Sequence, residues 1–369
     1  NLARMRQISL ESQWHDSDDV VGWFELERFA NGLRLFKNDR LLIDYTDMLQ
    51  LFLDRGRAPK LDVMFVDEAQ DLSPLQWAVV RKLCESADRI YIAGDDDQAI
   101  YRWAGADVDY LIRNSKDAMV LKQSYRIPKS IHTLAERCIG QVASRVQKTW
   151  NPRKEAGHVS WEKSYESIDM ESGDWLVLAR TNYLLNGIEE HCRSEGWFYK
   201  TKNRNSVSEK KVKAVRDWET LRKGGEIHLV DLIKVLNYMR VSVPTSLERN
   251  DFDSNISFEE AQSYLPELKQ EYWYDLFDGI SVSERSYIRA MLRRGEKITK
   301  EPRIKLSTIH AAKGGEAENV ILLTDISNRI YKSYQANPDD ESRVFYVGLT
   351  RAKQNLFLIE PQTQKYFQI

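Results

Sequence analysis

Two adjacent carboxylates, Asp67 and Glu68, follow a short apolar run in a position that suits nucleotide hydrolysis. The run VMFV at residues 63–66 is typical of a strand buried on both faces of a parallel sheet. Ligand sites of open α/β sheets gather where such strands end. One carboxylate could hold Mg²⁺, and the other could orient and deprotonate an attacking water. A solvated acidic loop is the alternative for an isolated pair, but the preceding strand, with Gln70 and Asp71 following, favours function.

A second segment whose residues could take part in chemistry follows the run IYIA. It is GDDDQAIYRW, at residues 94–103. A turn of Gly and Asp lets the backbone approach a ligand. Gln98 is then placed to sense a phosphate. Tyr101 and Trp103 could stack on the bases of a single strand, which contributes about 1–3 kcal/mol per base. Core packing is the commoner fate of a lone aromatic side chain, but polar neighbours on both sides favour exposure.

The elements that must position these residues form a strand–helix–strand unit. Ser73 and Pro74 predict an N-cap and a first helical residue. Leu75, Val79 and Leu83 would line one face of the helix, which connects the two strands as a right-handed crossover. Residues 1–58 have helical spacing, and residues 205–300 are charged, aromatic and helical. Further strands are expected at residues 175–178, 305–308, 320–323 and 356–359.

Composition limits the classes of function. With 54 Lys+Arg against 56 Asp+Glu, the net charge of -2 argues against binding of nucleic acid by bulk charge, but a locally basic groove is not excluded. No apolar stretch approaches the roughly 18 residues that span a membrane, and no export signal is visible. Three widely spaced cysteines favour buried thiols in a reducing cytosol, so we expect a cytoplasmic protein. The first residue, Asn1, suggests a fragment.

Seven segments, five motifs and two flanking segments, occur in the order of one known family. The match covers about residues 42–359, and its parts are LIDYTDML (42–49), VDEAQD (66–71), AGDDDQAIYRWAGAD (93–107), LKQSYRIPKSI (121–131), LARTN (178–182), LSTIHAAKGGEAENVILL (306–323) and VFYVGLTRAKQNLFLI (344–359). These segments resemble motifs II to VI, with their flanking strands, of superfamily 1 DNA helicases of the UvrD/Rep/PcrA type. The resemblance implies an ATP-driven motor that translocates 3′ to 5′ on single-stranded DNA and opens single-strand/duplex junctions.

The resemblance also implies residue roles. For hydrolysis, Asp67 would bind Mg²⁺ and Glu68 would be the catalytic base. Gln98, Arg126 and Arg351 would contact the γ-phosphate of ATP. Tyr125 would stack on adenine, and Glu316 would hold the ribose. On the DNA side, Tyr101, Trp103 and His310 would touch the single strand. The alternatives are surface salt bridges for Arg126 and Arg351 and a satisfied core histidine for His310.

The implied fold is α/β, with two RecA-like P-loop-NTPase motor domains built on parallel sheets, the first incomplete, and helical inserted subdomains. The expected parts are the end of a helical insertion (1–58), the C-terminal part of the first motor domain (59–118), the first part of the second motor domain (119–204), an inserted helical subdomain (205–300) and the second part of the second motor domain (301–369).

The sequence departs from the family pattern at the phosphate-binding loop, G-x-x-x-x-G-K-[ST], whose backbone and Lys hold the phosphates. None of the 17 glycines is followed by Lys. We therefore expect the front of the first motor domain to be missing, an apolar edge of its sheet to be exposed, and the chain alone to be inactive. Ala104 and Gly315 replace the usual Arg and Leu. Basic clusters around the insertion could meet duplex phosphates or form solvated helix faces; they are Lys210, Lys211, Lys213, Arg293, Arg294, Lys297, Lys300, Arg303 and Lys305.

Two other functions stay open. One is a non-hydrolysing DNA-binding or assembly module, against which Glu68, Gln98, Arg126 and Arg351 count because they are types that hydrolysis needs. The other is a motor completed in trans by a second polypeptide that carries the P-loop.

Overall fold

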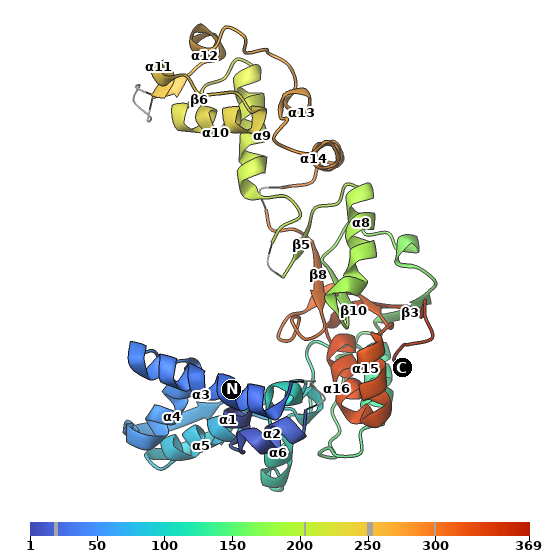
Figure 1. Ribbon diagram of the computed structural model, residues 1–369. Coiled ribbons are helices and arrows are strands. Elements are labelled where there is room, and N and C mark those ends of the chain that lie inside the picture. Colours follow the sequence, from blue (N-terminus) through green and yellow to red (C-terminus); the bar gives the residue numbers. More distant parts are fainter. Residues whose placement is uncertain (18–20, 203, 249–253, 299) are drawn as a thin grey trace. The chain divides into compact units, whose positions relative to one another are not determined.

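The computed structural model describes residues 1–17, 21–202, 204–248, 254–298 and 300–369, and many of its helices and strands are labelled in Figure 1. The chain divides into two units. Unit 1 comprises Asn1–Ala156, Asn328–Thr350 and Phe367–Ile369, and unit 2 comprises Gly157–Ser327 and Arg351–Tyr366. Each unit is therefore assembled from segments that are distant in the sequence.

Unit 1 begins with the predicted helical segment. Its helices are α1 (Leu2–Arg6), α2 (Leu10–His15), α3 (Trp23–Arg40) and α4 (Tyr45–Arg55). Helix α4 begins at a capping box, in which the Asp44 carboxylate accepts from the Asp47 backbone N–H at 2.8 Å and the Asp47 carboxylate accepts from the Asp44 N–H at 2.8 Å. Lys37 of α3 donates to both carboxylates and so holds α3 against the start of α4.

The predicted strand–helix–strand unit is present. Strand β1 (Leu61–Val66) pairs in parallel with β2 (Ala87–Ile92), and α5 (Pro74–Cys84) connects them. Helix α5 starts at Ser73, whose hydroxyl and backbone form a capping box with Gln76, so the predicted N-cap is confirmed.

The prediction that β1 is buried on both faces is wrong. Met64 and Val66 belong to the cluster that includes Trp77 of α5, whereas Phe65 is 76% exposed and stacks on Tyr91 of β2. Successive side chains of a strand point to opposite faces, and among the described residues β1 pairs only with β2. One face therefore packs on the crossover helix α5, while the other face exposes apolar side chains such as Phe65.

The rest of unit 1 surrounds the loops that follow β1 and β2. Its elements are η1 (Ala69–Asp71), η2 (Asp96–Gln98), η3 (Arg102–Ala104), α6 (Val108–Asn114), α7 (Lys129–Ile139), α15 (Asn328–Ala336) and α16 (Pro338–Leu349). Helix α16 packs against α7, α15 and η2. Phe345 of α16 also stacks on Phe367, with ring centroids 4.1 Å apart.

Unit 2 is built on a six-stranded parallel sheet. In spatial order its strands are β3 (His158–Glu162), β10 (Ala352–Ile359), β9 (Ala317–Leu323), β4 (Trp175–Ala179), β8 (Ile304–Thr308) and β5 (Tyr199–Thr201). The four strands predicted in this part of the chain are present, and β3 and β5 were not predicted. Short elements η4 (Tyr165–Ser167), η5 (Asn182–Leu185) and α8 (Asn186–Ser194) accompany the sheet. The α/β class with a large parallel sheet is confirmed and is consistent with RecA-like motor domains.

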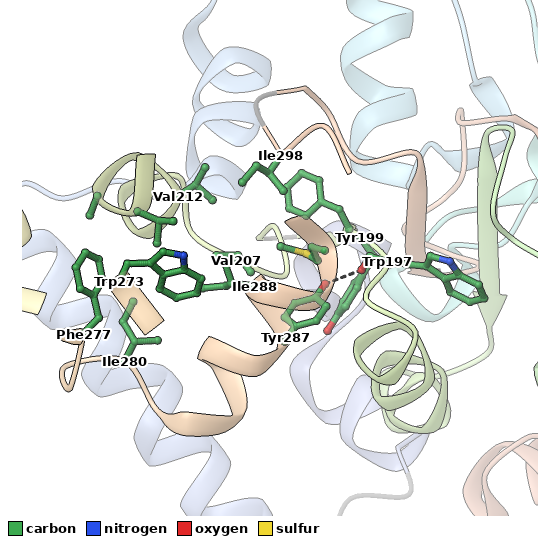
Figure 2. Close-up of a cluster of buried hydrophobic side chains, with 14 of the residues drawn as sticks. Trp197, Tyr199, Val207, Val212, Trp273, Phe277, Ile280, Tyr287, Ile288 and Ile298 are labelled. Carbon is green, nitrogen blue, oxygen red and sulfur yellow. Dashed lines mark hydrogen bonds between the residues drawn. The ribbon is translucent and has the colours of Figure 1, made fainter. Parts of the chain in front are cut away.

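The region at 205–300 is mainly helical, as predicted. It contains α9 (Glu209–Arg222), β6 (Ile227–His228), α10 (Leu229–Met239), α11 (Thr245–Glu248), β7 (Asn255–Ile256), α12 (Phe258–Tyr264), α13 (Trp273–Leu276) and α14 (Val282–Arg294). Figure 2 shows how α14 joins this region to the sheet: the Tyr287 hydroxyl donates to the Trp197 carbonyl at 2.6 Å beside Tyr199 of β5. One hydrophobic cluster contains residues of both parts.

The observed units differ from the predicted domain boundaries. Residues 119–156 and 328–350 group with unit 1, because α16 packs on both α7 and η2. The helical region at 205–300 groups with the six-stranded sheet, because the two share a core. The assignment of these segments to two motor domains stays a prediction.

No disulfide links the three cysteines, of which Cys138 and Cys192 are buried and Cys84 is partly buried. In the described part of the chain, every helix is too short or too polar to cross a bilayer.

The α4 capping box predicts a pH-dependent loss of stability at acid pH. Burial opposes ionisation of Asp44, but the hydrogen bond from Lys37, the Asp47 N–H and the charges of Lys37 and Arg4 together lower its pKa from 3.8 to about 2. Because the folded pKa is the lower one, this stabilisation is complete above pH 3.8 and is lost as the pH falls towards 2.

We expect Asp44→Ala to lower the free energy of unfolding at pH 7 by about 1–2 kcal/mol, the usual loss for an N-cap. The difference from wild type should shrink as the pH falls from 4 towards 2 in urea titrations, with the exposed Asp39→Ala as control. An equal difference at every pH would contradict the proposed ionic origin.

Candidate functional site

The predicted carboxylate pair lies in a strained turn directly after β1. Glu68 has φ 51° and ψ 38°, a left-handed conformation that is uncommon for a residue with a side chain. Its backbone N–H donates to the Asp67 carboxylate at 2.8 Å, and both side chains are exposed. Such conformations persist only where the surroundings enforce them, and they concentrate at functional sites.

Gln70 connects this turn to the loop that follows β2. Its side chain is fully buried. The amide nitrogen donates to the Glu68 carboxylate, and the amide oxygen accepts from the Asp95 N–H at 2.9 Å. A Cβ atom on Gly94 would lie 2.8 Å from the same amide oxygen, so glycine makes room for the bridge. Sequence analysis noted Gln70 only as a neighbour of the carboxylates and did not predict this role.

The loop after β2 carries the predicted γ-phosphate and DNA residues. The Gln98 side chain donates to the Asp95 carboxylate at 2.7 Å. Tyr101 is partly buried, and burial, followed by the charges of Asp71 and Glu68, raises the pKa of its phenol. Tyr101 therefore lies in the electrostatic field of the carboxylate turn.

Trp103 lies on the solvent side of the same loop. Its side chain is 66% exposed, and its ring centroid is 6.4 Å from that of Tyr101 at an interplanar angle of 55°. The expectation that Trp103 is exposed, and not packed in a core, is confirmed. The neighbouring Tyr101 is only partly accessible.

Tyr125 and Arg126 occupy a turn before α7, within unit 1. The Ser124 hydroxyl accepts from the backbone N–H groups of Arg126 at 3.3 Å and Ile127 at 3.1 Å, which fixes the turn. The Tyr125 ring is largely exposed and the Arg126 side chain is partly buried.

The remaining predicted residues lie in unit 2. Arg351 is 1% exposed, and its Nη1 donates to the Gly315 carbonyl at 3.2 Å. The adjacent residue, Glu316, is exposed and pairs with Lys353 at 3.1 Å. The structure thus brings Arg351 next to the predicted ribose residue. His310 is partly buried in the turn that follows β8.

The geometry therefore forms two groups. In unit 1, hydrogen bonds run from Glu68 through Gln70 and Asp95 to Gln98. In unit 2, Arg351 adjoins Glu316. The convergence of Glu68 and Arg351 on one nucleotide stays a prediction.

Two family models match this chain on either side of the inserted region. Residues 26–119 match the UvrD/REP helicase N-terminal domain, and residues 267–363 match the UvrD-like helicase C-terminal domain. The chain belongs to the UvrD/Rep family of helicases. The two matches together span just over half of this family member and include the carboxylate turn, the Gln98 loop and Arg351.

The relatives that this UvrD-like chain matches are named as DNA helicases. It is 22% identical to a probable DNA helicase II homolog of Rickettsia conorii, over 90% of the chain and 65% of the relative. It is 28% identical to the ATP-dependent DNA helicase PcrA of Bacillus subtilis, over 52% of the chain and 26% of the relative. It is 24% identical to the ATP-dependent DNA helicase srs2 of Schizosaccharomyces pombe, over 94% of the chain and 51% of the relative. The chain thus spans less than two thirds of these relatives' lengths.

The Gln70 bridge predicts a measurable loss of stability on its removal. Gln70→Ala removes the acceptor of the Asp95 N–H and one donor to the Glu68 carboxylate. We expect the free energy of unfolding to fall by about 1–3 kcal/mol, as for other buried groups that lose a hydrogen-bond partner. Urea denaturation at neutral pH measures the change.

Gln50→Ala is the matched control, since Gln50 is an exposed amide that donates to Asp54 at 3.0 Å. Its effect should stay below about 0.5 kcal/mol, the usual range for surface changes. An equal loss of unfolding free energy in Gln70→Ala and Gln50→Ala would contradict the proposed bridging role of Gln70.

Proposed function

We propose that this chain forms most of an ATP-dependent motor that moves 3′ to 5′ along single-stranded DNA and unwinds duplexes, and that the chain alone turns over little ATP. The connected Glu68–Gln70–Asp95–Gln98 path is the observation that carries the proposal, because it links a hydrolytic carboxylate to the loop that presents Trp103. The direction of movement rests on the family resemblance.

The carboxylate turn fits the metal and water side of a nucleotide site. Asp67 and Glu68 offer exposed oxygens where a parallel strand ends, and Mg²⁺ in nucleotide sites needs only one or two carboxylates besides waters and phosphates. When bound, Mg²⁺ with ATP would supply a polarised γ-phosphate. Asp67 would hold the metal, Glu68 would accept the proton of the attacking water, and Gln98 would contact the γ-phosphate. The chain's sequence offers no G-x-x-x-x-G-K phosphate cradle.

Arginines complete the proposed hydrolytic site. Arg126 and Arg351 would neutralise charge that develops on the γ-phosphate, an effect worth about 10³–10⁵ in rate in other phosphoryl-transfer systems. Tyr125, whose ring is exposed, would stack on adenine, and Glu316 would hold the ribose. In the structure, Arg351 donates to the Gly315 carbonyl, next to Glu316. The loop that contains Gly315 would therefore position both Arg351 and Glu316.

A basic groove in unit 2 supports contact with the duplex part of a junction. It has a volume of about 1000 Å³ and lies at the start of α9 and α14; its cationic lining residues are Arg193, Lys200, Lys202, Arg204, Lys210 and Lys211. Local basic grooves bind phosphates even on a chain of near-zero net charge. Two of these cations pair with glutamates, Lys200 with Glu301 and Lys211 with Glu284 at 2.7 Å. Lys213, Arg294 and Arg303 also form ion pairs within the protein.

The missing phosphate cradle could come from an upstream segment of the same polypeptide or from a separate P-loop polypeptide. A non-hydrolysing DNA-binding or assembly module is the alternative of another class. The strained Glu68 and its bridge favour hydrolysis over that alternative, since a binding module has no need to maintain a strained carboxylate.

The chain alone should show no DNA-stimulated ATP hydrolysis above background. Addition of a P-loop-bearing front segment of the family should restore it, and Glu68→Gln should then reduce kcat about 10²–10⁴-fold, the usual contribution of a general base. A coupled phosphate-release assay with and without single-stranded DNA measures both effects.

Glu85→Gln, an exposed glutamate at the end of α5, is the control and should leave kcat unchanged. Turnover by the chain alone that disappears in Glu68→Gln would show that no added cradle is needed.

Trp103→Ala should weaken single-strand binding about 5- to 150-fold, from about 1–3 kcal/mol for one stacked base. Fluorescence anisotropy of a labelled oligonucleotide measures the dissociation constant in the restored motor. Trp161→Ala is the control, because Trp161 is also well exposed, at 46%, but lies on β3 of unit 2. Unchanged affinity in Trp103→Ala would exclude the stacking role.

A further inference from the structure

Two cations, Arg145 and Lys148, pair with three consecutive aspartates after β2 within unit 1, and a third, Arg343, contacts the main chain of the same segment. Asp96, Asp97 and the cation Arg343 are almost completely buried. Lys148 Nζ lies 2.9 Å from an Asp95 oxygen and 3.0 Å from an Asp97 oxygen, and it also contacts Asp96. Arg145 donates two parallel hydrogen bonds to the Asp97 carboxylate, from Nε to Oδ1 at 2.8 Å and from Nη2 to Oδ2 at 2.6 Å.

Helix α16 is tied to the same loop through Arg343. Its Nε donates to the Asp96 carbonyl at 2.9 Å, and its Nη2 donates to the Ser144 carbonyl. The backbone N–H of Val146 donates to the Asp96 carboxylate at 2.8 Å. The loop before Lys148, the loop after β2 and α16 therefore meet at one set of charges.

This network is an ion lock and not a metal site. The three carboxylates lie close enough together to share a metal ion, but the Lys148 ammonium already lies between them. Burial opposes ionisation of Asp95 and Lys148, yet the facing charges outweigh it, so the pKa of Asp95 is lowered and that of Lys148 is raised. Removal of a cation would leave uncompensated buried carboxylates, which is strongly unfavourable.

Asp95 belongs both to this lock and to the site. One of its carboxylate oxygens faces Lys148 and the other accepts from Gln98 at 2.7 Å, while its backbone N–H bonds to Gln70. The lock therefore holds the first residue of the segment that carries Gln98, Tyr101 and Trp103. Helix α16 in turn runs in sequence directly into Arg351.

We propose that Arg145, Lys148 and Arg343 are positioning residues that hold the segment 95–103 in one conformation and connect it to α16. The role rests on the proposed function, because the positioned side chains are Gln98 and Trp103. The cations would act through the segment Asp95–Asp97 that they contact, and not by binding nucleotide or DNA themselves. Loosening of the lock would free the segment while the sheets stay folded.

The test uses the full chain with Lys148→Met, which removes the shared cation but keeps the length of the side chain. Amide hydrogen exchange should become about 10-fold or more faster in residues 96–104, as expected for a local opening, and stay unchanged in β4 of unit 2. Binding of a fluorescein-labelled oligo(dT) should weaken about 5-fold, from the loss of part of one stacking contact. Lys148→Arg should recover most of both effects.

Lys213→Met is the matched control. Lys213 also pairs with two aspartates, Asp217 at 2.7 Å and Asp231 at 2.5 Å, but it lies at the surface of unit 2. It should change neither exchange in residues 96–104 nor binding. If Lys148→Met does not fold, the double variant Lys148→Met with Asp95→Asn removes one charge of each sign and should show the same local opening.

The outcomes separate the lock from the proposed function. Unchanged exchange in residues 96–104 of a folded Lys148→Met chain would overturn the lock. Faster exchange with undiminished oligo(dT) binding would overturn its role in positioning. If the wild-type chain binds no oligo(dT), the proposed function loses its support, and the exchange data alone still decide whether the lock holds the segment.

Discussion

Two main-chain hydrogen bonds at the end of the small parallel sheet determine where the candidate residues of unit 1 lie. Ala93 donates to the Val66 carbonyl at 2.7 Å, and Ala69 donates to the Ala93 carbonyl at 3.0 Å. Both loops must therefore leave the sheet side by side, and the carboxylate turn and the Gln98 loop become neighbours although some 25 residues separate them. The buried amide of Gln70 can then bridge them, and the strained backbone of Glu68 is held in place.

Unit 2 positions its own residues by the same kind of constraint. The Arg351 carbonyl accepts from Ala317 at 3.1 Å, so the start of β10 is fixed beside the start of β9. The loop of Gly315 and Glu316 immediately precedes β9, and it therefore lies within reach of the Arg351 side chain. In both units, adjacent parallel strands bring residues from distant motifs to one sheet edge.

The sequence was most informative where the signal is local. Short runs of residues typical of strands predicted β1, β2, β4, β8, β9 and β10, and Ser73-Pro74 predicted the start of α5, because these preferences depend on neighbouring residues. The burial of β1 was predicted wrongly, since it depends on which elements cover each face. The short strands β3 and β5 escaped prediction because their stability comes from partners distant in the sequence.

In the candidate site, too, the sequence predicted local features but not contacts between distant residues. Family motifs indicated Asp67, Glu68, Gln98 and Arg351 by residue type and order. The left-handed backbone of Glu68 and the ion lock could not be read from the chain, because Lys148 lies about fifty residues from the aspartates it neutralises and Arg343 about two hundred further. Isolated charges in a chain with 30% charged residues are usually solvated. Only the fold shows which of them are buried together.

The strand order of the large sheet also bears on how the protein is made. Edge strand β3 pairs only with β10 within that sheet, so the partner of His158 is Asn355, nearly two hundred residues later. During synthesis, β3 leaves the ribosome long before its partner exists, and pairings of such long range form slowly. The nascent chain must therefore protect this unpaired β edge from aggregation until β10 has been synthesised, so the supply of chaperones affects the yield of folded protein.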